Sequence, residues 1–135
     1  MEPSLQQVGL AVKRLQWQHH RSANTRLAEI GLSLVQWDVL RHLAANPGAS
    51  LHDLAGLTFQ TDQSMGALAT RMIGNGLIER VPGPGRAIRH RLTAAGEQAF
   101  RAGSAIVDGV FDDTLARLSK AELSSLYALL TRALG

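Results

Sequence analysis

The sequence predicts a mainly α-helical fold with one small β-hairpin, in the order α-α-α-α-β-β-α-α. Apolar residues recur at helical spacing over most of the 135 residues. Between residues 77 and 92, two short runs flank a Gly/Pro-rich loop, which is typical of a hairpin. Finally, 45% of the residues are hydrophobic but only 4% are aromatic, so the core consists of aliphatic side chains that suit helices.

The first predicted helix covers residues 4–30. Its seam residues recur at alternating spacings of three and four, namely Leu5, Val8, Val12, Leu15 and His19. Such a seam must be covered, either by the chain's own C-terminal helices or by a second copy of the chain. Gly31 is expected to end the helix in a left-handed cap.

The second predicted helix begins at Ser33, because Gln36 follows at the spacing of a capping box. Residues 46–48, Asn-Pro-Gly, stop it. Its apolar face consists of Val35, Val39, Leu40 and Leu43, with Trp37 alongside.

A third and a fourth helix follow, separated by a turn at residues 57–60. Ser50 is the expected N-cap of the third helix, with Asp53 at the box position. Either Thr61 or Asp62 caps the fourth helix.

The fourth helix separates its side chains into two faces. The expected inward residues are Met65, Leu68, Met72 and Ile73. The expected outward residues are Gln63, Ser64, Ala67, Thr70 and Arg71. The outward face is small and hydrogen-bonding, as a helix lying deep in a groove roughly 12 Å wide requires.

The predicted hairpin has strands at residues 77–80 and 88–92, joined by a tight loop with two Pro, two Gly and one Arg. In the second strand, Ile88, His90 and Leu92 share one face, and Arg89 and Arg91 share the other. Two capped helices complete the chain: Thr93 begins the fifth, and Ser119 with Glu122 begins the sixth.

Formal charge is concentrated in the same part of the chain. Residues 61–92 carry five arginines and two acids, which gives +3, and the remaining nine bases and nine acids cancel. Two short helices, a turn and an arginine-bearing hairpin are the outline of a winged helix-turn-helix, a module that lays one helix in the DNA major groove.

This outline predicts a set of DNA contacts. The residues expected to face the groove are Gln63, Ser64, Ala67 and Arg71. Arg86, in the loop of the hairpin, is the candidate for the minor groove. Thr61, Arg89 and Arg91 are expected to meet phosphate. The competing interpretation is that these positions form a solvated helix face and solvent-facing strand arginines.

Other classes of function are weakly supported. The chain has no Cys, which excludes disulfides and thiolate metal sites. No nucleophile elbow, phosphate-binding glycine loop or paired-carboxylate signature is present, so we expect neither an enzyme nor a bound cofactor. The adjacent His19 and His20 point about 100° apart on a helix and do not favour a shared metal ion. The absence of a long apolar run predicts a cytoplasmic protein that meets no membrane.

A small-molecule site is a further hypothesis. Trp17, Trp37 and His42 are candidates to line a pocket for an aromatic ligand. The alternative is that both tryptophans belong to the core, where this residue type is common.

The ordered motifs of the chain resemble the MarR family of bacterial transcriptional regulators, over about residues 5–134. The motifs are Leu34-Val35-Gln36-Trp37-Asp38-Val39-Leu40, Leu51-His52-Asp53-Leu54-Ala55, Gly76-Leu77-Ile78-Glu79-Arg80 and Leu92-Thr93-Ala94-Ala95-Gly96. Where the family's wing usually carries Asp-Arg-Arg, this chain has Pro84, Gly85 and Arg86. The wing is therefore expected to depend on proline stiffness.

The resemblance implies more than the residues themselves do. It implies one domain over residues 1–135, with a DNA-binding part at 32–93 and dimerisation helices at 4–30 and 94–134. It implies a homodimer on a pseudo-palindromic operator, a repressor role, and release by a small aromatic or phenolic ligand. The departure at the wing keeps an alternative open, a winged helix that binds protein or RNA without strong DNA binding.

Overall fold

A computed structural model describes residues 1–83 and 85–135, and it confirms the predicted fold class and order of elements. The elements are α1 (Leu5–Leu27), the short 3-10 helix η1 (Ala28–Ile30), α2 (Leu34–Ala45), α3 (Leu51–Leu57), α4 (Asp62–Gly74), β1 (Ile78–Arg80), β2 (His90–Leu92), α5 (Ala94–Leu115) and α6 (Lys120–Leu134).

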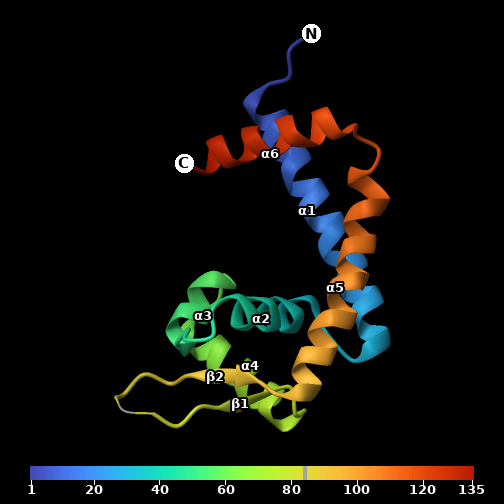
Figure 1. Cartoon of the computed structure of the whole chain (residues 1–135). Helices are drawn as coiled ribbons and strands as arrows, with labels where there is room; N and C mark the ends of the chain where they lie inside the picture. The colour runs from blue at the N-terminus through green and yellow to red at the C-terminus, as the bar shows by residue number, and fades with distance from the viewer. Residues whose placement is uncertain (84) are drawn as a thin grey trace.

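The elements form two parts, which Figure 1 shows one above the other. The lobe consists of α2, α3, α4 and the hairpin β1–β2. The arm consists of α1 and α5, which lie side by side, and of α6 at the far end near both chain termini. Helix α5 belongs to both parts, because it begins at the hairpin and ends beside α6. None of the helices in the described residues is both long and apolar enough to cross a membrane.

Side-chain caps fix where the helices begin. The Ser33 hydroxyl accepts a hydrogen bond from the Gln36 backbone at 3.2 Å, and the Gln36 carboxamide accepts one from the Ser33 backbone at 3.0 Å. The predicted boxes at Ser50 and Ser119 are also confirmed. Gly31 has a φ of 76°, so its left-handed cap is confirmed as well.

The hydrophobic core lies between the lobe, the end of α1 and helix α5. Its largest fully buried side chains are Leu27, Leu40, Leu54, Met65, Met72, Ile78 and Val39. Val107 and Val110 of α5 continue this core into the arm. Trp37 is buried where α2 meets α5, and a Cβ at Gly103 would lie 2.6 Å from its ring. The absence of a side chain at Gly103 therefore lets α5 approach α2 closely.

The hairpin is shorter than the sequence predicts. Its strands are antiparallel, and the register pairs Ile78 with Leu92 and Arg80 with His90. The prediction that the second strand begins at Ile88 is wrong, because β2 begins at His90; Ile88 lies before it and is 38% exposed, while His90 is buried. Here the chain turns toward the start of α3: the Ile88 carbonyl accepts from the Leu51 backbone at 2.8 Å, and Arg89 bridges to Ser50.

Candidate nucleic-acid interface

Helix α4 is held by one buried face and one cap. Met65, Leu68, Ala69 and Met72 are its buried residues, and the helix packs on α3 and β1. The Thr61 hydroxyl accepts from the Ser64 backbone at 3.0 Å, so Thr61 is the N-cap. The prediction that Ile73 points inward is wrong, since it is 41% exposed. Ile73 therefore lies at the margin of the apolar stripe of α4.

The opposite face of α4 is exposed, as the sequence predicts. Its residues are Gln63, Ser64, Ala67, Thr70 and Arg71. They combine an amide, two hydroxyls, a methyl group and one guanidinium, and nothing bulky stands between them. Such a face combines donors and acceptors for base edges with a methyl surface for thymine.

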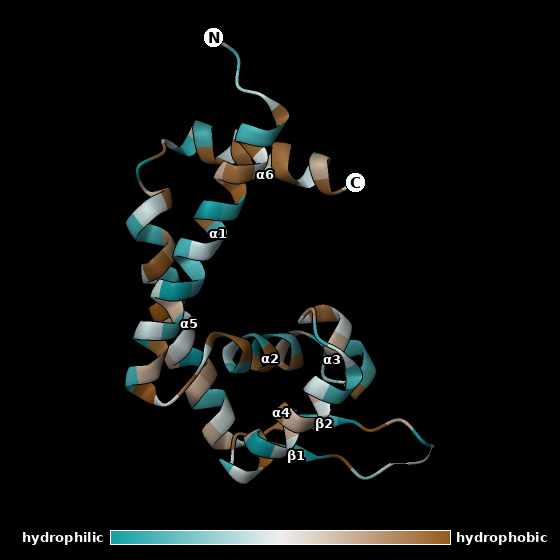
Figure 2. Cartoon of the chain, turned by 180° about the vertical axis from the view of Figure 1, so that it is seen from behind, coloured by the Kyte–Doolittle hydropathy of each residue, from teal (hydrophilic) through white to brown (hydrophobic). Residues whose placement is uncertain are grey.

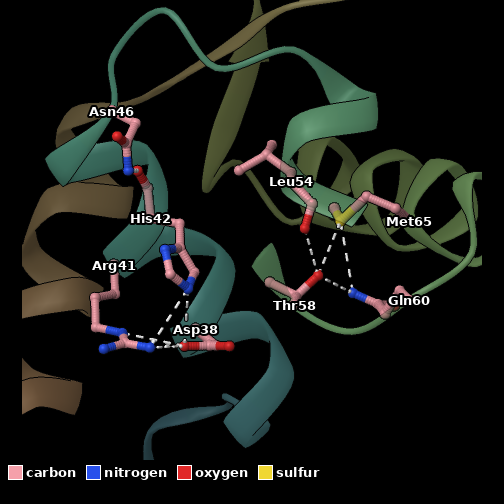
Figure 3. A network of polar contacts seen from close by, with 8 residues as sticks. All are labelled: Asp38, Arg41, His42, Asn46, Leu54, Thr58, Gln60 and Met65. Atoms are coloured by element: carbon pink, nitrogen blue, oxygen red, sulfur yellow. Dashed lines mark hydrogen bonds and ion pairs between the residues drawn. The ribbon is translucent and has the colours of Figure 1, made fainter. Parts of the chain in front are cut away.

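A small polar network fixes the turn that precedes α4, and Figure 3 shows it. The Thr58 hydroxyl donates to the Leu54 carbonyl at 2.6 Å. The Gln60 amide donates to the Thr58 oxygen at 2.8 Å and to the Met65 sulfur at 3.5 Å. Thr58 and Met65 are buried, so this network ties the turn to the first turn of α4. The sequence gives no signal for it, because a thioether at this spacing is indistinguishable from an ordinary core residue.

The arginines of the hairpin fall into two groups. The Arg89 guanidinium donates to the Gly48 carbonyl, and that of Arg91 pairs with Glu79 across the strands at 2.7 Å. Both arginines therefore have partners within the chain and brace the base of the hairpin. Arg86 is exposed in the loop, which extends away from the helices (Figure 1).

The structure describes two of the three residues that stand in place of the family's Asp-Arg-Arg pattern, Gly85 and Arg86. Pro84 lies outside the described residues, so the expectation of proline stiffness at that position stays a prediction. Gly85, in the same loop, has a φ of 94°, which an L side chain rarely adopts. A glycine at this position therefore permits a backbone path that the family's usual arginine would not favour.

His90 is a buried polar residue at the base of the hairpin. It is 3% exposed, and its Nδ1 has no hydrogen-bond partner in the described part of the chain. Burial lowers the pKa of His90, and the nearby positive charge of Arg80 lowers it further. The imidazole is thus held neutral between the hairpin and α2.

The structure does not bring the three predicted ligand-pocket residues together. Trp17 is exposed on α1 and stacks on the His20 ring with centroids 5.5 Å apart. Trp37 is buried, and its indole N–H donates to the Ser104 hydroxyl at 3.2 Å. His42, also on α2, lies 3.6 Å from Asp38 in the network that Figure 3 shows. Their distribution gives Trp37 a core role and separates it from Trp17.

An apolar hollow in the arm is the better-formed cavity, although the sequence did not indicate it as a pocket. It has a volume of about 640 Å³, and its lining includes Val12, Leu15, Phe111, Leu126 and Leu130. His19 also lines it, and its Nε2 is 2.7 Å from the Thr114 hydroxyl. Burial lowers the pKa of His19, so neutral imidazole is favoured there. Among the described residues, no three His, Cys, Asp or Glu side chains gather as metal ligands would.

The lobe defines the class of the protein: three helices and a two-stranded wing, with one exposed helix face beside it, form a winged helix-turn-helix. A model of the MarR family matches residues 30–87, which include α2, α3, α4 and β1 of this lobe. This match supports the resemblance to the MarR family, and the chain has the winged-helix fold of solved MarR structures.

Solved structures with the same fold, MarR proteins among them, match 93–99% of this chain. The complex of the Mycobacterium tuberculosis MarR family protein Rv2887 with salicylic acid is 26% identical, covers 99% of this chain and 98% of its own, and has a TM-score of 0.77. A mutant MarR from E. coli complexed with operator DNA is 18% identical, covers 95% of this chain and 94% of its own, and has a TM-score of 0.84. MepR, a transcription regulator of a Staphylococcus aureus multidrug efflux pump, is 22% identical, covers 93% of this chain and 95% of its own, and has a TM-score of 0.74. None of the curated proteins matches the chain.

Proposed function

We propose that the chain is a sequence-specific DNA-binding transcriptional regulator that acts as a homodimeric repressor. The exposed face of α4 is the observation that carries this proposal. Gln63, Ser64 and Ala67 supply groups that read base edges, and Arg71 supplies a cation near the end of the same face. Solved relatives with the same fold include complexes with DNA, which supports this assignment.

The wing extends the proposed interface beyond α4. Arg86 reaches the minor groove from the exposed loop, where a narrow A/T-rich groove attracts an inserted guanidinium. Thr61 and the backbone at the start of α4 meet phosphate. Arg89 and Arg91 act first as braces of the hairpin, and they meet phosphate only with the part of the guanidinium that their partners leave open.

The arm supports the proposal of a homodimer. Its apolar side chains remain exposed in the single chain, notably Leu5 at 91% and Leu134 at 88%. Figure 2 shows hydrophobic residues along α6 and the adjoining end of α1. A second copy that packs its own α1 and α6 on these helices buries the apolar seam that the sequence predicts. Two lobes then face the two halves of a pseudo-palindromic operator.

The proposal also includes a small molecule that releases the protein from DNA. The hollow between α1, α5 and α6 combines apolar walls with the imidazole of His19, which suits a phenolic or aromatic compound. A relative has been solved with salicylic acid, which supports this ligand class. This hollow replaces the pocket of Trp17, Trp37 and His42 as our candidate. The alternative function is a winged helix that binds protein or RNA, and it would be favoured if the chain did not bind DNA.

The experiment that tests the proposal is selection of bound sequences from random duplex DNA, carried out with and without salicylate. A repressor of this class enriches an inverted repeat, and its affinity falls steeply as salt rises. Salicylate at millimolar concentration is expected to reduce recovery of that repeat. Recovery of no sequence above background would contradict the proposed function. Enrichment that salicylate leaves unchanged would contradict only the ligand part.

A further inference from the structure

His52 and Asp62 join the two helices of the helix-turn-helix on the exposed surface of the lobe. The Nδ1 atom of His52, near the start of α3, lies 2.9 Å and 3.0 Å from the two carboxylate oxygens of Asp62, the first residue of α4. The two side chains are 82% and 65% exposed. The pair is therefore accessible to a macromolecule that docks on α4.

We propose that His52 is a further DNA contact, which binds a backbone phosphate as an imidazolium. The Asp62 carboxylate accepts a hydrogen bond from the Nδ1–H of His52. Each copy of the chain therefore takes up one proton when it binds DNA. The proposal rests on the proposed DNA-binding function. It adds a contact from α3 and a pH dependence that the residues of α4 do not have.

Hydrogen-bond chemistry carries the proposal. A carboxylate accepts only, so the 2.9 Å contact places the ring proton on Nδ1. In neutral imidazole the other nitrogen, Nε2, is then a bare acceptor, and a phosphate oxygen has no proton to share with it. Only the imidazolium donates from both nitrogens. A phosphate at Nε2 consequently requires the second proton.

The position of the pair places it among the proposed DNA contacts. Asp62 stands directly between the N-cap Thr61 and the groove-facing Gln63. An unpaired carboxylate there would repel the DNA backbone, because two like charges meet at short range. An imidazolium at His52 neutralises Asp62 and directs a charge-assisted hydrogen bond outward.

The surrounding charges favour the imidazolium. Asp62 raises the pKa of His52, first through its hydrogen bond and then through its charge, and Asp53 on α3 adds a smaller contribution in the same direction. Asp53 itself is held as a carboxylate: hydrogen bonds from Ser50 lower its pKa, with a smaller contribution from the charge of Arg89 on the hairpin. DNA phosphate would favour the charged ring further.

The test measures DNA affinity against pH at constant ionic strength. The probes are the duplex recovered by selection and a random duplex, each of about 21 base pairs so that two helical turns are present. We expect the wild-type protein to bind both probes about tenfold more weakly near pH 8.5 than near pH 6, because the proton bound in the complex must be supplied. Fluorescence anisotropy of the labelled duplex measures this directly.

Three variants separate the contact from a structural role. H52Q removes the titrating group and is expected to bind weakly at every pH. H52R keeps a permanent cation and is expected to bind tightly at every pH. D62N releases Nδ1, so neutral His52 can turn Nε2–H toward phosphate, and the pH response should shrink or move to lower pH. Each variant's fold is checked by its circular dichroism spectrum.

The matched control is H42Q, which alters a second His–Asp pair, with Asp38 on α2 and away from α4. It is expected to keep the full pH response of the wild-type protein. Affinity that does not vary with pH, or an H52Q variant that keeps the wild-type response, would overturn the inference while leaving DNA binding intact. Absence of DNA binding at every pH would overturn the proposed function as well.

Discussion

The carbonyl oxygen of Leu77 fills the place where a side chain on Gly96 would begin. A Cβ on Gly96 would lie 1.9 Å from that oxygen, far inside van der Waals contact. The same carbonyl accepts a hydrogen bond from the Thr93 backbone at 3.1 Å. The first turn of α5 is thereby locked against the entrance of the hairpin.

Gly96→Ala is therefore expected to destabilise the fold. Backbone atoms must shift to admit the methyl group, and the expected loss in the free energy of unfolding is about 1–3 kcal/mol or more. Gly56→Ala is the control, because it lies within α3 and no atom approaches its Cβ position within 4 Å. That change should instead stabilise the helix by about 0.5–1 kcal/mol. Chemical denaturation of both variants provides the comparison, and equal stability would contradict the lock.

Arg71→Ala and Arg86→Ala are expected to weaken DNA binding, each by about 1–3 kcal/mol if the guanidinium meets a base edge. An arginine that meets phosphate instead should reduce the slope of affinity against salt by about one per contact. Arg117→Ala serves as the control, because Arg117 lies in the connection between α5 and α6, and Figure 1 shows that connection at the end of α5 opposite the hairpin. Titrations at several salt concentrations distinguish the two kinds of contact. A double variant with unchanged affinity would show that the groove assignment is wrong.

Val12→Asp is expected to separate the proposed dimer. Val12 is 50% exposed in the single chain and lines the hollow of the arm, so a carboxylate there would be buried without a partner on association. Ile73→Asp is the control, since Ile73 is similarly exposed but lies on α4. Sedimentation at micromolar concentration should give twice the chain mass for the wild-type protein and the control. A monomeric wild-type protein would contradict the dimer.

Stability is expected to fall in mild acid because of His90. Its pKa is lowered in the folded chain, so the unfolded chain binds the extra proton more readily. The resulting loss begins as pH falls through the ordinary histidine value near 6.5 and continues down to the lowered folded value. His90→Leu should flatten this part of a plot of melting temperature against pH. If the slope of melting temperature against pH is unchanged in His90→Leu, the loss of stability in acid comes from other groups, such as His19.

Local sequence signals were enough to locate most helices. The caps at Ser33, Ser50 and Ser119 depend on residues three positions apart, so they are visible in the sequence. The same pattern at Ser4 and Gln7 begins α1 and would have given its start more sharply. Gly31 likewise marks a helix end by its own conformational freedom.

Contacts between distant segments were not predictable in the same way. The bond from Arg89 to the Gly48 carbonyl depends on the path of two loops, and nothing local indicates it. The pairing of His52 with Asp62 depends on the angle between α3 and α4. For the same reason the sequence grouped Trp17 with Trp37, although one is exposed on the arm and the other is buried against α5.

Helix α5 gives the molecule a mechanical property. Its 22 residues form one uninterrupted rod of about 33 Å, capped at the hairpin and leaning on α1 along the arm. A tilt of about 5° at the arm end would displace the hairpin end by about 3 Å, roughly half the width of a minor groove. Small adjustments where two copies meet would thus be magnified into the spacing of the two α4 helices, because the close contact between Gly96 and Leu77 couples α5 rigidly to the hairpin.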